Sequence, residues 1–274
     1  MRATQNVQRA AATSVRSTTA SGSVVYESER AVHEYLQFHF GDPKKVVPYA
    51  FAPQDAVAFL PRTVEESARL TPTGQRRRAL DVGCAVGRAT FELARHFDEA
   101  VGVDFSHHFA ETANKMKSEG KLPYDALIQG DIWEVRQAAV PSDIDRTKVH
   151  FEQGDACNLK PSLGKFDVVF ASNLLCRLPN PEKFLTDVSS FINPNGIFAL
   201  ISPYSWLEEY TAKDKWIGGV LDSNGKRIES FDQIERILSS NFKLVKRQDY
   251  PFIIREHARK YQWGVSDGTF WQRK

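Results

Sequence analysis

Cysteine is scarce in this sequence, which has only Cys84, Cys157 and Cys176 among 274 residues. No two of them lie at the close spacing of zinc-binding or redox motifs. Their odd number fits the reducing interior of a cell, with each thiol as a small buried side chain. The seven histidines, including His107 and His108, likewise show no spacing of metal ligands, so we expect no metal.

The sequence also lacks an excess of charge and a long apolar run. It contains 36 Lys and Arg against 34 Asp and Glu, a net charge of +2, and the charges are interspersed. This pattern gives no basic stripe for nucleic acid, and no apolar run approaches the roughly 18 residues of a membrane span. The arginines at 76–78 are interpreted as a solvated strand entry, with a phosphate site as the alternative. We therefore expect neither a nucleic-acid nor a membrane partner.

Acidic residues are missing from the N-terminal segment, residues 1–25. No acid occurs before Glu27, whereas Arg, Ser, Thr and Ala are frequent. This composition is typical both of an organellar transit peptide and of a disordered tail. We interpret the segment as a tail outside the fold of a cytoplasmic protein, and keep organellar targeting as the alternative.

A glycine turn between two apolar runs is the most informative pattern that is present. The first run includes Asp81, continues through Gly83 and Gly87, and leads into a segment with helical periodicity. A second apolar run follows and ends at Asp104. In an open α/β sheet this arrangement places a ligand crevice at the carboxyl ends of adjacent parallel strands. The glycines allow the backbone to approach the ligand, and Asp104 can hold a ribose diol.

The spacing of the glycines distinguishes between two cofactors. Dinucleotide-binding turns use G-x-G-x-x-G to hold a pyrophosphate at a helix N-terminus. Here the pattern is D-x-G-x-x-x-G, with Val86 where a middle glycine would lie. S-adenosyl-L-methionine contains no phosphate, so a looser turn suffices, and we predict it as the cofactor with S-adenosyl-L-homocysteine as product. A dinucleotide site and an ordinary strand–helix turn with incidental glycines are the alternatives.

Strands and helices are predicted to alternate along most of the chain. The predicted strands are residues 79–82, 100–104, 149–153, 166–171, 197–202, 242–250 and 262–270. The predicted helices are residues 27–40, 64–70, 88–96, 109–119, 181–191 and 231–238. This order matches the α/β, Rossmann-like, seven-stranded mixed sheet of class I S-adenosylmethionine-dependent methyltransferases, with helices on both faces and an antiparallel last strand.

Three further expectations concern the organisation of the chain. Residues 26–274 are expected to form one domain, in which the helical segment 26–72 is a lid over the cofactor. Residues 121–148 are only weakly periodic and are expected outside the core. Residues 193–196 have the composition of a turn before the fifth strand.

Polar residues at the predicted strand ends form the candidate cofactor site. Asp155 follows the third strand, where it can accept a hydrogen bond from an adenine amino group; a helix or turn cap is the alternative. Asn173 and Arg177 follow the fourth strand, which faces the methyl group, with a surface ion pair as the alternative for Arg177. The predicted cofactor-binding residues are Asp81, Gly83, Cys84, Ala85, Gly87, Asp104, Phe105, Asp155, Ala156 and Asn173.

Three other segments can contribute to an acceptor pocket. Tyr35 and His39 lie on the first predicted helix, although a lone histidine is more often structural and aromatic residues at helical spacing are usually core. The fifth strand is followed directly by Tyr204, Trp206, Glu208 and Glu209. Arg255 and Glu256, between the last two strands, form either a solvated pair or a site for an amino-acid head group.

From about residue 26 to its C-terminus, the chain resembles the 5-thiohistidine (4-mercaptohistidine) N-methyltransferases that complete ovothiol biosynthesis. This family occurs as the C-terminal domain of ovothiol synthase or as a stand-alone enzyme. The strand-one motif is shared by many methyltransferases, but the blocks FHFG at 38–41, SPYSWLEE at 202–209 and IRE…RK.QW at 254–263 are more particular. We expect the stand-alone form, working with a separate sulfoxide synthase and a lyase.

The resemblance implies methylation of the imidazole ring nitrogen nearest the amino-acid side chain of 5-thiohistidine, which gives ovothiol A. Because the substrate thiolate is a better nucleophile than the ring nitrogen, the site has to hold the acceptor in line with the donor methyl group. We expect Arg177 or Arg255 to bind the substrate carboxylate. Glu256 or Glu208 would then lie near the substrate amine.

His39 is expected to orient the imidazole or to take its proton, because the usual pKa of histidine suits that task. The predicted catalytic residues are His39, Tyr204 and Asn173. The predicted substrate-binding residues are Tyr35, His39, Arg177, Tyr204, Trp206, Arg255 and Glu256. The alternatives are a methyltransferase for another small histidine-like or thiol acceptor, a non-catalytic binding protein, and a nicotinamide oxidoreductase.

Overall fold

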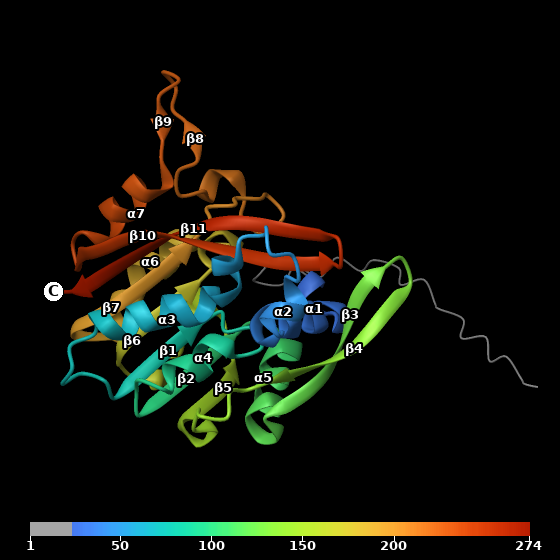
Figure 1. The fold of residues 1–274 in the computed structure, drawn as a ribbon. Coiled ribbons are helices and arrows are strands. Elements are labelled where there is room, and N and C mark those ends of the chain that lie inside the picture. The colour runs from blue at the N-terminus through green and yellow to red at the C-terminus, as the bar shows by residue number, and fades with distance from the viewer. Residues whose placement is uncertain (1–23) are drawn as a thin grey trace, which may run out of the picture.

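The computed structural model describes residues 24–274, so most of the predicted leader, residues 1–25, lies outside the described residues (Figure 1). A seven-stranded sheet forms the centre of the fold, and all seven predicted strands belong to it. In spatial order its strands are β10 (Phe242–His257), β11 (Lys260–Arg273), β7 (Ile192–Ser202), β6 (Phe166–Ser172), β1 (Arg78–Val82), β2 (Glu99–Asp104) and β5 (Val149–Gln153).

The direction of the strands creates a switch point beside β1. This strand is parallel to both of its neighbours, β2 on one side and β6 on the other. The parallel pairing continues from β2 to β5 and from β6 to β7. β11 is antiparallel to β7, and β10 is antiparallel to β11. Because the strand order reverses between β1 and β6, a crevice forms at the carboxyl ends of these strands.

Helices cover both faces of the sheet (Figure 1). The first face packs against α1 (Glu29–Phe40), α3 (Phe59–Leu70), α4 (Arg88–Leu93) and α5 (His107–Glu119). The second face packs against α6 (Pro181–Asp187) and α7 (Ser230–Leu238), while α2 (Pro43–Val46) lies between α1 and α3 in the chain. Successive strand residues alternate between the two cores: Ala79 belongs to the first and Leu80 to the second.

Short 3-10 helices occupy several of the connections. They are η1 (Val24–Glu27), η2 (Gln54–Ala58), η3 (Arg146–Lys148), η4 (Ala156–Asn158), η5 (Pro161–Leu163), η6 (Leu175–Arg177), η7 (Val188–Phe191) and η8 (Lys213–Lys215). No helix within residues 24–274 is long and apolar enough to cross a bilayer.

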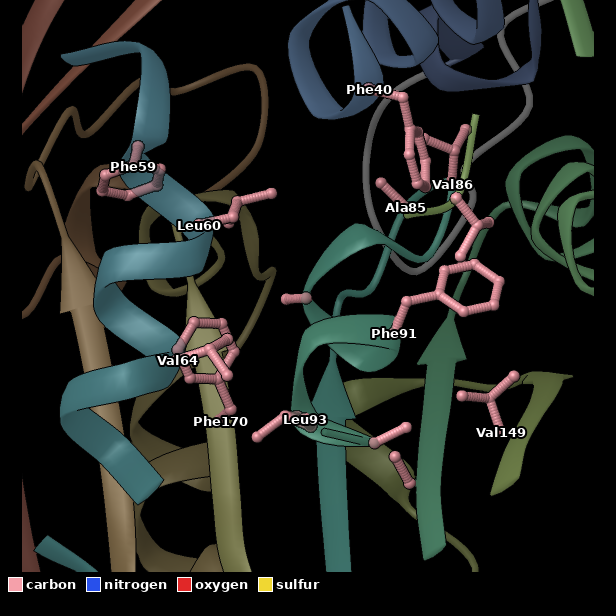
Figure 2. Packing of buried hydrophobic residues seen from close by; sticks show 14 of the residues in the cluster. Phe40, Phe59, Leu60, Val64, Ala85, Val86, Phe91, Leu93, Val149 and Phe170 are labelled. Atoms are coloured by element: carbon pink, nitrogen blue, oxygen red, sulfur yellow. The ribbon is translucent and has the colours of Figure 1, made fainter. Parts of the chain in front are cut away.

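Aromatic rings fix α3 and α4 on the first face of the sheet, as Figure 2 shows. Val64 of α3 lies next to Phe170 of β6, and both side chains are fully buried. Phe91 of α4 lies between two other rings, with centroid distances of 6.1 Å to Phe40 and 5.3 Å to Phe151. These contacts bring α1, α4 and β5 into one apolar core.

The ring of Phe151 also packs against the backbone of two glycines, Gly87 and Gly102. A Cβ atom on Gly87 would come within 2.7 Å of this ring, and one on Gly102 within 2.6 Å. Gly87, at the start of α4, also has a φ of 92°, which disfavours other residues. Close packing between α4, β2 and β5 therefore depends on two glycines that face one aromatic ring.

The expectation that residues 121–148 lie outside the core is wrong. They include the hairpin of β3 (Lys121–Gln129) and β4 (Ile132–Ala139), which packs against α1. Tyr124, Ala126 and Ala138 are buried in the first core. Only one face of the hairpin is buried, and on β4 the buried side chains are those of Arg136 and Ala138, so the strand lacks a clear apolar period of two residues.

Several other boundaries differ from the sequence prediction. β10 extends to His257, so Arg255 and Glu256 belong to this strand and do not lie between the last two strands as expected. Residues 193–196 do not form a separate turn but belong to β7, whose pairing with β6 is irregular at this end. The helix predicted at 64–70 begins earlier, at Phe59, because Pro61 is tolerated in a first turn. The helix predicted at 88–96 ends at Leu93. A further hairpin of β8 (Val220–Leu221) and β9 (Arg227–Ile228) was not predicted.

We expect the substitution Phe91→Ala to lower the free energy of unfolding by about 3–5 kcal/mol, because it empties a buried ring site between two other rings. Phe51→Ala is the matched control, since the Phe51 side chain is 90% exposed, and it should change stability by less than about 0.5 kcal/mol. Urea denaturation followed by circular dichroism measures both. Equal losses for the two variants would contradict the packing described.

Candidate functional site

A cavity of about 390 Å³ opens at the carboxyl ends of the central strands, at the predicted switch point. Residues from η1 and α1 close its outer side. Its lining contains most of the predicted site residues, namely Tyr35, His39, Asp81, Gly83, Cys84, Ala85, Asp104, Phe105, Asp155, Ala156, Asn173 and Arg177. The sequence motif and the candidate site therefore coincide.

The turn after β1 brings backbone to the cavity. Gly83 has a φ of 77° and Ala85 a φ of 46°, both in the left-handed region. A Cβ atom on Gly83 would come within 2.8 Å of the Leu174 side chain on the facing wall. Gly87 ends this turn without lining the cavity, because its missing side chain accommodates the ring of Phe151.

Asp104, at the end of β2, presents a carboxylate that is fixed by the backbone. Its Oδ2 accepts a hydrogen bond from the Ala85 N–H at 2.8 Å, and its Oδ1 accepts one from the Ser106 N–H at 2.9 Å. Burial raises the pKa of Asp104 to about 6, although the two N–H groups oppose this shift. Each oxygen retains a lone pair, so the group can accept two further hydrogen bonds from a diol.

Asp81, on the neighbouring strand, is a second buried carboxylate, only 2% exposed. The Thr90 hydroxyl donates to its Oδ2 at 2.7 Å. Burial, together with the nearby charge of Asp104, raises the pKa of Asp81 to about 7. Asp81 and Asp104 thus lie at the same end of the cavity, where few hydrogen-bond donors are available to them.

Asp155 caps η4 and lines the cavity as well. Its Oδ1 accepts a hydrogen bond from the Cys157 N–H at 2.8 Å, so the capping role considered from the sequence is present. The rest of this wall is apolar and includes Phe105, Ala156 and Leu174. A flat heterocycle with an amino group at its edge is the kind of ligand that such a wall can hold.

The opposite end of the cavity contains polar groups from the end of β6. The Ser172 hydroxyl is buried and has no hydrogen-bond partner within residues 24–274. Asn173 has a φ of 53°, and its Oδ1 accepts a hydrogen bond from the Ser266 hydroxyl at 2.7 Å. That bond orients the Asn173 side chain and leaves its amide N–H groups for a ligand.

His39, on α1, lines the cavity and has an unusually low pKa. Burial lowers its pKa to about 3, and the charge of Arg88 adds to this shift. Its Nδ1 is buried and has no hydrogen-bond partner among the described residues. His39 therefore does not have the ordinary pKa expected from the sequence, and its ring is a weak base.

Arg177 and three tyrosines form the outer wall of the cavity. The Tyr26 ring lies 6.0 Å from that of Tyr35 and 6.2 Å from that of Tyr210, between centroids. The Arg177 guanidinium lies 4.5 Å from the Tyr210 ring centre and donates to the Ser205 carbonyl at 2.8 Å. Within the described part of the chain, Arg177 forms no ion pair with an acid, so the surface-pair alternative is not what the structure contains.

Sequence reasoning missed Tyr26 and Tyr210 as members of this wall. Tyr26 belongs to η1, and its backbone carbonyl accepts a hydrogen bond from the Ser106 hydroxyl at 3.0 Å. Glu27 also lines the cavity, where its Oε1 accepts the His107 N–H at 3.2 Å. The SPYSWLEE block ends one residue before Tyr210, which was the available signal for that residue.

Besides Gly87, four predicted residues lie outside the cavity lining. The Trp206 ring packs in the second core, where its Nε1 donates to the Ser230 hydroxyl at 3.0 Å. The Tyr204 hydroxyl donates to Asp267 at 2.9 Å, after a backbone turn with a φ of 51°. The Trp206 ring points away from the cavity because it is buried in the second core. The Tyr204 side chain points away because its carboxylate partner, Asp267, lies outside the cavity lining.

Arg255 and Glu256 are the other two. Arg255 is only 3% exposed and donates to the Lys45 carbonyl at 2.5 Å, at the C-terminal end of α2. Glu256 accepts a hydrogen bond from Gln262 at 2.9 Å and pairs with Lys260 at 2.7 Å. Arg255 therefore ties β10 to the N-terminal helices. Glu208 and Glu209, which the sequence offered as further candidates, are exposed.

The described residues contain no group of three or more His, Cys, Asp or Glu side chains that could hold a metal ion. Their three cysteines are free and buried. Burial raises the pKa of each thiol, most strongly at Cys84, so none is activated as a thiolate.

We expect the free energy of unfolding of the ligand-free protein to contain a term that falls as pH rises from about 4 to 7. Asp81 keeps its proton up to about pH 7 in the fold, against 3.8 for an ordinary Asp, so the folded state binds more protons in this range. Asp81→Asn retains an acceptor for Thr90 and removes this term. Denaturation at several pH values should show the variant gaining stability relative to wild type as pH rises, whereas a constant difference would contradict the assignment.

Comparison with known proteins places the chain in a family. Residues 51–246 match the family described as "Methyltransferase domain". The magnesium-protoporphyrin O-methyltransferase of Rhodobacter capsulatus is 25% identical over 185 residues, which cover 65% of this chain and 69% of that protein. A Saccharomyces cerevisiae protein, "Probable S-adenosylmethionine-dependent methyltransferase CRG1", is 25% identical over 163 residues. This match covers 51% of this chain, which spans about half of the length of the yeast relative.

Solved structures share the fold. The magnesium protoporphyrin IX methyltransferase of Synechocystis with bound S-adenosylhomocysteine has a TM-score of 0.55 and 18% identity, covering 91% of this chain and 96% of its own. The [4+2]-cyclase SpnF has a TM-score of 0.57 and 16% identity, covering 93% and 97%. The predicted Rossmann-like, seven-stranded fold class is confirmed. With its cofactor, S-adenosyl-L-methionine, now also supported, the chain belongs to the methyltransferase domain family and is an S-adenosylmethionine-dependent methyltransferase.

Proposed function

We propose that this enzyme methylates the imidazole ring of 5-thiohistidine to give ovothiol A. The observation that carries the proposal is the outer wall of the cavity, where Arg177 has no acid partner within the described residues and lies beside Tyr26, Tyr35 and Tyr210. A small aromatic amino acid presents a carboxylate and a flat ring to such a wall. The resemblance of the FHFG and SPYSWLEE blocks to 5-thiohistidine methyltransferases supports the same acceptor.

The cofactor would occupy the end of the cavity formed by β1, β2 and β5. Asp104 would accept hydrogen bonds from the ribose diol, and the free oxygen of Asp155 would accept one from the adenine amino group. The turn at Gly83 would provide backbone groups for the amino-acid end. When bound, S-adenosyl-L-methionine supplies an electrophilic methyl group, so the protein mainly has to position the acceptor.

The acceptor would lie between this end and the outer wall. Arg177 would bind its carboxylate, while Tyr26 and Tyr35 would contact its ring. Among the expected partners for the amine, Glu208 and Glu256 lie outside the cavity lining, so Glu27 of the lining is the better placed acid, and it would bind the amine in addition to its contact with His108. A head group held at both charges fixes which ring atom faces the donor methyl group.

His39 would orient the ring rather than take its proton. Its pKa of about 3 makes it a weak base, but its buried and unpartnered Nδ1 can accept a hydrogen bond from the ring N–H that does not react. Asn173 and Ser172 offer further hydrogen bonds at the same end. Fixing the non-reacting nitrogen directs the other nitrogen, and not the thiolate, toward the methyl group.

The size of the cavity supports a small acceptor. Its volume of about 390 Å³ lies near the lower limit of ligand sites, which range over roughly 300–1,000 Å³. Most of that space would be taken by the cofactor. We further propose that residues 26–72 act as a lid within a single domain of residues 26–274, because η1 and α1 supply the outer side of the cavity.

Incubation with S-adenosyl-L-methionine and 5-thiohistidine under reducing conditions should give a product with one added methyl group on a ring nitrogen. Mass spectrometry with fragmentation measures this, and histidine is the parallel control, expected to give no product. A methyl group on sulfur, or turnover of histidine alone, would overturn the proposed acceptor. Either result would favour another small histidine-like or thiol acceptor for the same methyltransferase.

We expect Arg177→Gln to lower kcat/KM for 5-thiohistidine by about 10- to 100-fold, because a hydrogen bond to a charged group contributes about 1.5–3 kcal/mol. Its affinity for S-adenosyl-L-homocysteine, measured by calorimetry, should stay within a few-fold of wild type. Arg247→Gln is the matched control, since Arg247 also lies over an aromatic ring, that of Phe231, but outside the cavity lining. Equal effects of the two substitutions would exclude Arg177 as the carboxylate ligand.

A further inference from the structure

An exposed strand edge lies on the hairpin that packs against α1. We propose that the free edge of β4 pairs in antiparallel fashion with β4 of a second copy of this chain, so that two hairpins join in a four-stranded sheet across a two-fold axis. Figure 1 shows this hairpin projecting at the side of the molecule, beside α1. This pairing does not depend on which acceptor the enzyme uses.

The hairpin has one covered edge and one free edge. At the β3 edge, the Asp125 N–H donates to His33 of α1 at 3.2 Å, and the Ile128 carbonyl accepts the Ala258 N–H at 3.2 Å. Within residues 24–274, β4 pairs with β3 alone. The backbone groups on the other side of β4 are therefore available to a strand from another molecule.

The hydrogen-bond pattern identifies which residues face that free edge. At the base of the hairpin, the Val140 N–H donates to the Gly120 carbonyl at 2.9 Å. Because antiparallel pairing alternates along a strand, Glu134 and Arg136 also direct their backbone groups toward β3. The backbone N–H and C=O groups of the alternate residues Trp133, Val135 and Gln137 then point outward, at the spacing of a β-ladder.

The side chains along this edge are apolar and exposed. Val135 is 73% exposed, Ile132 55% and Trp133 46%. Soluble proteins usually protect such an edge with Lys, Pro or a very short strand. β10, at one edge of the main sheet, has Lys243, Lys246 and Pro251, and β5 at the other edge has only five residues. β4 has eight residues and neither Lys nor Pro.

Charge complementarity selects one register for the pair. Within one copy, Arg136 and Glu134 already form an ion pair at 2.9 Å, and the Arg136 side chain is only 8% exposed. With the two Val135 residues opposite each other, Glu134 of each copy also faces Arg136 of the other, so the two internal pairs would lie side by side with opposite charges adjacent. Trp133 then faces Gln137. Centring the pair on Glu134 or on Arg136 would instead place like charges opposite each other, which is unfavourable. The same strand thus complements itself, as a two-fold interface requires.

Pairing would also remedy a weakness of the isolated hairpin. A two-stranded ribbon is marginally stable in water, whereas three or more strands with an apolar face are stable. Here the hairpin is held by α1, β10 and its own contacts. In the joined sheet, the exposed Val135 and Trp133 side chains would each gain a cross-strand neighbour from the other copy.

Light scattering after size-exclusion chromatography of the full chain tests the proposal. We expect twice the chain mass of 31.0 kDa for wild type and the mass of one chain for Val135→Lys, with kcat within about two-fold. Leu221→Lys is the matched control, since Leu221 is 66% exposed on another small hairpin, and it should remain a dimer. A monomeric wild type, or a dimer that persists in Val135→Lys, would overturn the proposal.

Cross-linking tests the register and does not depend on the folding of the Lys variant. Val135→Cys places two thiols opposite each other, at a spacing that a disulfide can bridge. We expect it to form a covalent dimer on oxidation, while Gln137→Cys remains uncrosslinked because Trp133 would face it. The native cysteines are buried and do not compete. Efficient cross-linking through position 137 and none through position 135 would refute this pairing.

Discussion

Two carboxylates removed from water determine how the carboxyl ends of β1 and β2 are built. A buried acid without hydrogen-bond donors costs several kcal/mol, so donors have to be brought to it. Asp104 obtains them from the N–H groups of Ala85 and Ser106, and Asp81 obtains one from the Thr90 hydroxyl. Ala85 reaches Asp104 only because the chain adopts positive φ angles directly after β1. The glycine turn, the start of α4 and the cap of α5 thus together supply the hydrogen-bond donors for these two carboxylates.

Asp104 also connects the end of the cavity beside β1 and β2 to its outer side. Ser106, whose N–H binds Asp104, uses its hydroxyl to cap α5 and to bind the Tyr26 carbonyl. Tyr26 in turn contacts the rings of Tyr35, Phe109 and Tyr210. Segments from η1, α1 and the region after β7 therefore meet over the cavity through a few aromatic contacts. An enclosed site of this kind excludes water from the methyl group and strengthens charged contacts within it.

The sequence allowed the end of the cavity beside β1 and β2 to be predicted because its residues are local. Asp81, Gly83 and Asp104 each occupy a strand end or the turn that follows it, and the strand periodicity locates those ends. The outer wall of the cavity depends on contacts between distant segments, so Tyr26 and Tyr210 were missed. Trp206 was expected at the site because it follows β7, but the direction of its ring depends on the second core. The pKa of His39 likewise depends on burial by the whole cavity wall.

Phe151 limits how the sequence of this enzyme can change over evolution. Its ring occupies the space in which a Cβ atom of Gly87 or of Gly102 would lie. The two glycines belong to different elements, the start of α4 and the middle of β2, so neither can acquire a side chain while the ring is present. A relative with alanine at either position should therefore have a smaller residue in place of Phe151. Among homologues, these three positions are expected to covary, although none of them lines the cavity.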